Sequence, residues 1–288
     1  MVEQSTIGVA VDRVRGDDLC AARDVLAIEE PLEIRLQFEA AGRLVRKTVS
    51  ITMRTPGDDT SLAAGFLFTE GIVRDQEQIE QIRPCGPAPT ADRSRNVIRV
   101  QLRAESLVDL ARLERHFYTT SSCGICGKTS IEALEATSAF TLPSGAPLID
   151  AAVVHRLPAA LRDAQSVFDR TGGLHASALF DTAGTLHALR EDVGRHNALD
   201  KVIGAEFLAG RLPLHDRILL VSGRASFELV QKAVMAGIPV LAAVGAPSSL
   251  AVDLAARWGM TLLGFVRDGR FNIYSGAERI AGVGALTT

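Results

Sequence analysis

The sequence predicts an α/β protein (α+β overall), in which a smaller β-rich N-terminal domain precedes a larger domain built on a mixed sheet. In the first third of the chain, apolar and polar residues alternate with a period of two, as in half-buried strands. From about residue 150, short apolar runs alternate with helical patterns, which favours a mostly parallel or mixed sheet covered on both faces. A chain of 288 residues allows two domains or one large unit. We expect two domains, at residues 1–118 and 119–288.

The first third contains a predicted β-hairpin followed by a helix. Alternating runs over residues 32–38 and 44–53 flank a turn at Ala41-Gly42. Pro56-Gly57-Asp58-Asp59 ends the second strand and begins a helix over about residues 61–69. A loop at 84–89, a strand at 96–102 and a helix at about 106–117 follow.

The last half is predicted to hold most of the strand–helix alternation. Strands are expected at residues 175–180, 185–189, 217–221, 240–243 and 261–265. Helices are expected at about residues 195–207, 226–235 and 248–258.

Composition excludes several classes of function. The formal net charge is −3 and the chain has one Trp and two Tyr, so neither phosphate neutralisation nor base stacking points to nucleic acid as a partner. No stretch approaches the roughly 20 apolar residues of a membrane-spanning helix, and the N-terminus lacks the features of a secretory signal. The four cysteines form a poor disulfide framework. We therefore expect a cytoplasmic protein without a membrane partner.

A cysteine pair, Cys123 and Cys126, is the strongest chemical signal. It stands in the segment Ser121-Ser122-Cys123-Gly124-Ile125-Cys126-Gly127-Lys128, whose glycines, hydroxyls and lysine favour a thiolate. A Cys-x-x-Cys pair serves as a nucleophile, a redox pair or half of a zinc site. A zinc site would need a second pair of ligands, and none lies nearby in the sequence. A thioredoxin-like motif would be followed by a long helix, and the helix expected here is short. We rank a reactive thiol first, a redox pair second and zinc third.

Two further segments have polar residues where a ligand would bind. Ser222, Gly223, Arg224 and Ser226 follow an apolar strand and begin a helix, the usual place for a phosphate in an open α/β sheet. Arg195 and His196 begin another helix, where capping alone would explain fewer polar residues. Both segments are candidate cofactor-binding sites.

Five ordered segments give the chain a resemblance to the FdhD family, the sulfur carriers needed for active formate dehydrogenase. The segments span about residues 30–280: Ala64-Gly65-Phe66-Leu67-Phe68-Thr69-Glu70-Gly71-Ile72, Ser122-Cys123-Gly124-Ile125-Cys126-Gly127-Lys128, Thr171-Gly172-Gly173-Leu174-His175-Ala176-Ser177-Ala178, Glu191-Asp192-Val193-Gly194-Arg195-His196-Asn197-Ala198-Leu199-Asp200-Lys201 and Ser222-Gly223-Arg224-Ala225-Ser226-Phe227-Glu228.

This resemblance implies a cytidine-deaminase-like mixed-sheet domain after the smaller N-terminal one, and a homodimer. It implies that Cys123 accepts persulfide sulfur from a cysteine desulfurase, with Cys126 as a supporting thiol. The sulfur would pass to a molybdenum (or tungsten) bis-guanine-dinucleotide cofactor before that cofactor enters formate dehydrogenase. It also places cofactor contacts at Phe265, Val266, Arg267, Asp268, Gly269 and Arg270, although Asp268-Gly269 alone is typical of a hairpin turn.

The chain departs from zinc deaminases at His175-Ala176-Ser177. A serine stands there in place of the glutamate that shuttles protons, and Ser122 rather than proline precedes the cysteine pair. We therefore expect no permanently bound metal. Two other functions stay open, a dithiol oxidoreductase and a non-catalytic chaperone that only binds the cofactor.

Overall fold

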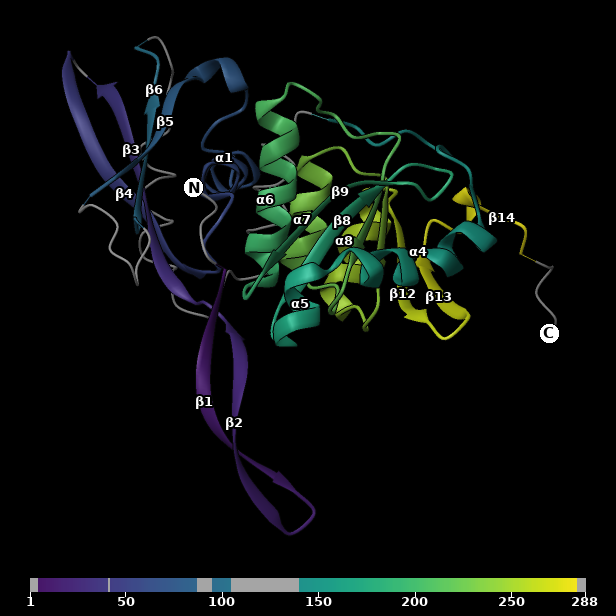
Figure 1. Ribbon diagram of the computed structural model, residues 1–288. Helices are drawn as coiled ribbons and strands as arrows, with labels where there is room; N and C mark the ends of the chain where they lie inside the picture. The colour runs from purple at the N-terminus through teal and green to yellow at the C-terminus, as the bar shows by residue number, and fades with distance from the viewer. Residues whose placement is uncertain (1–4, 41, 87–94, 105–139, 284–288) are drawn as a thin grey trace.

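The computed structural model describes residues 5–40, 42–86, 95–104 and 140–283 (Figure 1). An N-terminal β-rich part and a larger α/β part lie side by side, which confirms the predicted fold class. The predicted domain boundary, between residues 118 and 119, and the predicted helix at 106–117 lie outside the described residues.

The chain begins with an antiparallel ribbon of two strands, β1 (Thr6–Arg15) and β2 (Asp18–Ala27). The ribbon extends away from the rest of the molecule (Figure 1) and contacts helix α5 (Ser166–Thr171) at its base. Side chains on both faces of the ribbon are exposed, including Ile7 on one face and Val14 on the other. The sequence analysis assigned no strand here, because neither face is buried and the alternation of Ile7, Val9 and Val11 is short.

A four-stranded sheet follows, in the order β4-β3-β6-β5. The predicted hairpin is confirmed by β3 and β4, which pair antiparallel, whereas β6 runs parallel to β3. Helix α1 covers this sheet, and Gly71, two residues beyond the end of the helix, has a left-handed φ of 67°. The bounds are β3 Glu30–Ala40, β4 Arg43–Arg54, α1 Asp59–Thr69, η1 Gln76–Gln78, β5 Ile79–Cys85 and β6 Val97–Leu102.

The larger part is built on a six-stranded mixed sheet in the order β13-β12-β11-β10-β8-β9. Strands β10, β11 and β12 are parallel, and β8, β9 and β13 run antiparallel to their neighbours. The strands are β8 His175–Phe180, β9 Leu186–Asp192, β10 Ile218–Val221, β11 Val240–Ala243, β12 Thr261–Arg267 and β13 Arg270–Ser275; β7 Ile149–Asp150 and β14 Ile280–Ala281 form a small separate pair.

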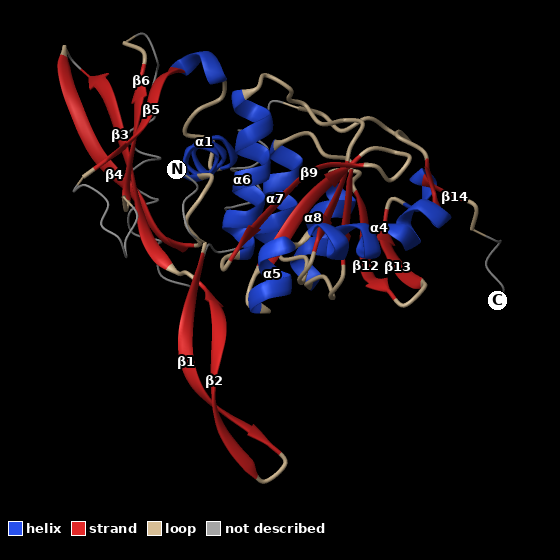
Figure 2. Ribbon diagram, viewed as in Figure 1, coloured by secondary structure: helices blue, strands red, loops and turns tan. Residues whose placement is uncertain are grey.

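Helices cover both faces of the six-stranded sheet (Figure 2). One face packs on α6, α7 and α8, and the opposite face packs on α4, so alternate residues of one strand, such as Leu219 and Leu220 of β10, enter different cores. The helices are α4 Ala151–Ala164, α5 Ser166–Thr171, α6 Arg195–Leu208, α7 Phe227–Met235 and α8 Ser249–Arg257. None of the helices described is long and apolar enough to cross a membrane.

The two parts meet where α1 packs against α6. A Cβ atom added to Gly65 would lie 1.9 Å from the carbonyl oxygen of Asp200, and one added to Gly204 would lie 1.9 Å from that of Ser61. The helix backbones are therefore in direct contact, an approach that only glycine allows. One continuous apolar core includes residues from β3, α1, α6 and α7. The N-terminal sheet is thus held rigidly against the α/β part.

Candidate functional site

The candidate site lies at the carboxyl ends of the parallel strands of the six-stranded sheet, where several chain segments converge. We call this end of the sheet its edge. The parallel strands β10, β11 and β12 all end at this edge, in the loops at residues 222–226 and 244–248 and the segment beginning at Phe265. Strand β8 begins here and β9 ends here, because His175 pairs with Asp192. Ligands in open α/β sheets bind at such an edge.

Backbone hydrogen bonds join the three loops to one another. The Gly245 N–H donates to the Gly223 carbonyl at 2.9 Å, and the Phe265 N–H donates to the Gly245 carbonyl at 3.0 Å. A Cβ atom on Gly245 would lie 3.2 Å from the Cα of Arg224. Glycine at position 245 therefore allows the sequence-predicted segments 222–226 and 265–270 to be neighbours.

The segment 222–226 presents its polar side chains at the start of α7. The Ala176 N–H donates to Ser222 Oγ at 2.9 Å, which ties the end of β10 to the start of β8. Arg224 is exposed, and Ser226 is the N-cap residue of α7 although its side chain makes no capping hydrogen bond. Arg224 is therefore available to a ligand, whereas the hydroxyl of Ser226 already has partners in His196 and Glu228.

The predicted segment at Arg195 and His196 contacts the segment 222–226 through His196. Its Nε2 lies 3.4 Å from Ser226 Oγ and 3.8 Å from a carboxylate oxygen of Glu228. Burial, together with the positive charges of Lys232 and Arg195, lowers the pKa of His196 to about 4. His196 is therefore neutral at pH 7 and able both to donate and to accept a hydrogen bond.

Asp192 fixes the start of α6 to the N-terminal sheet. One carboxylate oxygen accepts from the Gly194 N–H at 2.8 Å and from Asn197 Nδ2 at 3.0 Å. The other accepts from the Thr55 N–H at 3.2 Å and lies 2.7 Å from Lys201 Nζ. Asp192 is fully buried, so this cluster positions Arg195 and His196 rather than meeting a ligand.

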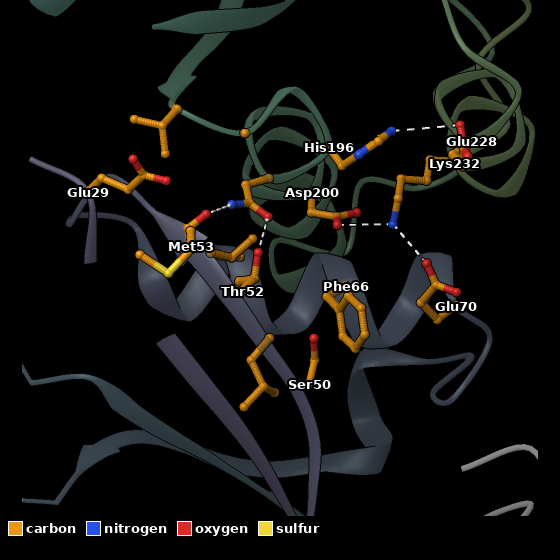
Figure 3. Close-up of a pocket in the computed structure, with 15 residues that line it drawn as sticks. Glu29, Ser50, Thr52, Met53, Phe66, Glu70, His196, Asp200, Glu228 and Lys232 are labelled. Atoms are coloured by element: carbon orange, nitrogen blue, oxygen red, sulfur yellow. Dashed lines mark hydrogen bonds and ion pairs between the residues drawn. The ribbon is translucent and has the colours of Figure 1, made fainter. Parts of the chain in front are cut away.

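A cavity of about 430 Å³ lies beside His196, at the seam between the two parts (Figure 3). Its walls come from β3, β4, α1, α6 and α7. Charged residues gather at one end, where Lys232 Nζ is 3.0 Å from Asp200 and 3.1 Å from Glu70. Thr69 Oγ1 donates to Asp200 at 2.9 Å. This buried network joins α1, α6 and α7 behind the candidate site.

The segment 265–270 forms the end of β12 and the turn into β13. Phe265 has a φ of 53°, a conformation that non-glycine residues rarely adopt and that often marks functional positions. The guanidinium of Arg267 lies 5.9 Å from the Phe265 ring centroid. Asp268 and Gly269, with φ of 53° and 69°, form the predicted hairpin turn. Val266 is fully buried and packs in the core.

A second cavity, of about 580 Å³, lies on the α4 side of the same edge. It is lined by residues of α4 and α5, by the turn before β8, and by Ser222 and Val244 at the ends of β10 and β11. Ser222 therefore belongs to both the predicted phosphate segment and this cavity.

The structure thus brings together the predicted residues Arg195, His196, Ser222, Gly223, Arg224 and Ser226, with the 265–270 segment beside them. Cys123 and Cys126 lie outside the described residues. The sequence reasoning missed Asp192, Glu228 and Lys232. The local sequence did not mark the two residues of α7, because Glu228, Gln231 and Lys232 share one face of this helix at helical spacing, a pattern that normally predicts exposure to solvent. Within the described part of the chain, no group of three His, Cys, Asp or Glu residues is placed to hold a metal.

The fold and the edge define a mixed α/β protein whose candidate ligand site lies at the strand ends, among helix N-termini and arginines. The FdhD/NarQ family model matches residues 27–281. The chain belongs to the FdhD/NarQ family.

Similar proteins agree with this assignment. A Streptomyces avermitilis protein named sulfur carrier protein FdhD is 52% identical over 94% of both chains. A protein of the same name from Mycolicibacterium paratuberculosis is 53% identical over 90% of this chain and 93% of its own. A crystal structure described as a candidate formate dehydrogenase accessory protein from Desulfotalea psychrophila has a TM-score of 0.72 and 26% identity, covering 96% of this chain and all of that one.

Proposed function

We propose that this protein is a sulfurtransferase that carries sulfur as a persulfide on Cys123 and delivers it to a molybdenum bis-guanine-dinucleotide cofactor required by formate dehydrogenase. The observation that carries the proposal is the similarity, over nearly the whole chain, to relatives named sulfur carrier proteins. The cysteine pair supplies the sulfur chemistry, and the sheet edge supplies the binding surface for the cofactor.

Loading is a thiol exchange with a persulfide on a cysteine desulfurase. The Cys123 thiolate attacks the terminal sulfur of the donor, a new S–S bond forms, and the donor cysteine leaves as a thiolate. Lys128 and the glycine-rich surroundings in the sequence favour the thiolate form of Cys123.

Release uses the second cysteine. The Cys126 thiolate attacks the inner sulfur of the Cys123 persulfide, a Cys123–Cys126 disulfide forms, and the terminal sulfur leaves as hydrosulfide with the electron pair. The two cysteines are oxidised and the transferred sulfur is reduced. A cellular dithiol then reduces the disulfide for the next cycle.

The sheet edge suits the diphosphate groups of the cofactor, which enters as the acceptor substrate. Helices α6, α7 and α8 all begin at this edge, so their N-terminal N–H groups and positive dipole ends face the same region. Arg195, Arg224, Arg267 and Arg270 are exposed or half-exposed on the same loops. Arginine is well suited to phosphate because it donates in a planar fork.

The proposal further holds that the protein acts as a homodimer in the cytoplasm, with a cysteine desulfurase and formate dehydrogenase as protein partners. No permanently bound metal is part of the mechanism.

Intact-mass measurement tests the loading step. After incubation with a cysteine desulfurase and cysteine, the protein should gain about 32 Da, one sulfur atom. Cys123→Ala should lose this adduct and abolish formate dehydrogenase activation. Cys20→Ala and Cys85→Ala serve as controls, because these thiols lie on β2 and β5, away from the candidate site, and both variants should keep the adduct.

Each rival function gives a different outcome. A dithiol oxidoreductase would turn over a disulfide substrate without acquiring a sulfur adduct. A non-catalytic chaperone would activate formate dehydrogenase without either cysteine but would fail after Arg224→Ala. Full activation by Cys123→Ala would overturn the sulfur-carrier proposal.

A further inference from the structure

The ribbon of β1 and β2 receives little support from its own chain. The two strands pair from Thr6 and Ala27 at the base to Arg15 and Asp18 at the tip. At about 3.4 Å per residue, strands of this length reach roughly 34 Å. Among the described elements, the ribbon contacts chiefly α5 at its base, where Arg170 donates to Thr6 Oγ1 at 2.9 Å. An isolated two-stranded hairpin is only marginally stable in water, so the outer part of the ribbon needs a surface to pack against.

Two pairs of large apolar side chains lie exposed on the ribbon. Ile7 and Leu26 are directly paired near the base, and Val14 and Leu19 are directly paired near the tip. Val14 is 64% exposed and Leu19 is 70% exposed, the highest value among the large apolar side chains in the described part of the chain. Apolar groups that gather on a surface in this way mark a site of contact with another molecule.

The twist of the ribbon brings the two pairs to one side. Successive residues of a strand point to opposite faces, so Ile7 and Val14 start from different faces of the ribbon. The two strands cross once between base and tip (Figure 1), which turns the ribbon over along its length. The four side chains of the two pairs therefore line one side of the ribbon, and we call them the apolar strip.

The size of the ribbon indicates what covers the apolar strip. One side of a two-stranded ribbon about 34 Å long and 10 Å wide offers on the order of 350 Å². A partner that meets this side once buries about 700 Å² in total, counting both surfaces, which is the size of an adventitious contact. A second copy of this chain buries about 1,400 Å², because a two-fold axis repeats the contact. Of these two arrangements, only the reciprocal one reaches the size of a stable interface.

The charges of the ribbon also suit a second copy. Residues 6–27 contain three arginines and four aspartates, which leaves a net charge of −1: Arg13, Arg15, Arg23, Asp12, Asp17, Asp18 and Asp24. A strongly acidic or basic partner would find no complementary patch here. Two copies, by contrast, can approach each other without a strong repulsion.

We propose that the ribbon is the arm through which two copies of this chain associate. Each ribbon lies with its apolar strip on the other copy, and a two-fold axis relates the two contacts. This arrangement explains why the ribbon is built with little support from its own chain. The inference rests on the proposed function for the existence of a homodimer and adds the surface that forms it.

Sedimentation equilibrium of the full chain measures the association, and the wild type should be a dimer. In the double variant Val14→Lys, Leu19→Glu, opposite charges occupy directly paired positions, so the hairpin keeps a favourable cross-strand pair while its tip loses the apolar surface. The dimer dissociation constant should rise by at least about 100-fold. Leu148→Lys is the matched control, because Leu148 is similarly exposed but precedes β7, outside the ribbon. It should change the constant by less than about threefold.

A wild type that stays monomeric at about 100 µM would overturn the proposal, even if its ribbon binds a different protein. Unchanged dimerisation of the folded double variant would overturn it as well, since the interface would then lie elsewhere. If the double variant does not fold, hydrogen exchange on the wild type decides. Amides of residues 6–27 should exchange more slowly at protein concentrations at which the dimer forms, and equal exchange in monomer and dimer would reject the arm.

Mass measurement of sulfur loading on Cys123 in the same samples separates this inference from the proposed function. A dimeric wild type that gains no sulfur overturns the sulfur-carrier proposal and leaves the arm in place. A monomeric wild type that loads sulfur keeps the sulfur-carrier proposal and overturns the arm.

Discussion

At the scale of single residues, His196 connects the candidate site to the charged network behind it. Its ring lies between Ser226 and Glu228 of α7 on one side and the 430 Å³ cavity on the other. The positive charges of Lys232 and Arg195 lower the pKa of His196. The negative charges of Glu228 and Glu70 raise it. Burial and the two cations outweigh the two carboxylates, which keeps the imidazole neutral at pH 7.

This neutral state predicts a pH dependence of stability. The folded pKa of about 4 lies below the ordinary value of 6.5, so the unfolded chain binds more protons between these two values. The free energy of unfolding should therefore fall as the pH drops through this window. Since the side chain is 36% exposed, we expect His196→Asn to reduce the loss between pH 7 and pH 5 by up to about 1 kcal/mol.

Urea unfolding at the two pH values measures this difference. His155→Asn is the control, because His155 is exposed on α4 and lies away from these charges. Identical pH dependence in wild type and His196→Asn would contradict the assignment of a neutral His196.

At the scale of elements, the contact between α1 and α6 gives a prediction with an unusual sign. Gly→Ala in a helix normally stabilises by about 1 kcal/mol. In α6 the added methyl of Gly204→Ala would lie 1.9 Å from the Ser61 carbonyl oxygen, so the helices must separate. We expect Gly204→Ala to lower the free energy of unfolding by about 3 kcal/mol.

Equilibrium unfolding in urea checks this expectation. In Gly8→Ala the new methyl finds its nearest neighbour 4.0 Å away, so this control should change stability by less than about 0.5 kcal/mol. A stabilised Gly204→Ala variant would show that the two helices do not pack through their backbones.

Elements with a clear apolar run or a clear helical periodicity were predictable from the sequence. The apolar runs of β8 and β11 gave their observed bounds, and α6, α7 and α8 differ from expectation by a residue or so at each end. Among the elements that were missed, two have a clear physical reason. Pro158 interrupts the helical pattern of α4, although Asp150 caps it by accepting from the Ala152 N–H. Strand β13 is only half-buried, and the alternation of Phe271 and Ile273 with polar residues is too short to mark a strand.

The candidate site was predictable only in part. Arg195, Ser222 and Arg224 stand directly beside strand ends, and the parallel-sheet rule brings such positions together. The cavities were not predictable, because their walls combine distant segments. Gln165, Phe168 and Val244 meet only through the packing of α4 and α5 on the sheet. The left-handed backbone of Phe265 likewise depends on tertiary contacts, and no local sequence signal marks it.

At the scale of the whole molecule, one core holds the two parts together and the ribbon stands apart. The described core links the N-terminal sheet to α6 and α7, whereas the ribbon contacts the remainder chiefly at α5, where Arg170 donates to Thr6 Oγ1. The family match begins at residue 27, where the ribbon ends.

Removal of residues 2–27 should therefore leave folding intact. We expect a single thermal transition with Tm within about 4 °C of the full chain, since few buried contacts are lost. Ile34→Ala in β3 gives the contrast, because Ile34 is fully buried and its truncation should cost about 2–5 kcal/mol. A large fall in Tm, or aggregation of the shortened chain, would indicate that the ribbon covers surface that needs protection.

The carboxylate of Asp192 has a consequence for which substitutions the protein tolerates. Its two oxygens accept from four different donors, on Thr55, Gly194, Asn197 and Lys201. Asparagine would turn an NH₂ group toward donors, and glutamate would carry the oxygens one carbon too far. We therefore expect no other amino acid to satisfy all four donors at position 192, whereas the side chain of the exposed Arg224 is not fixed in this way.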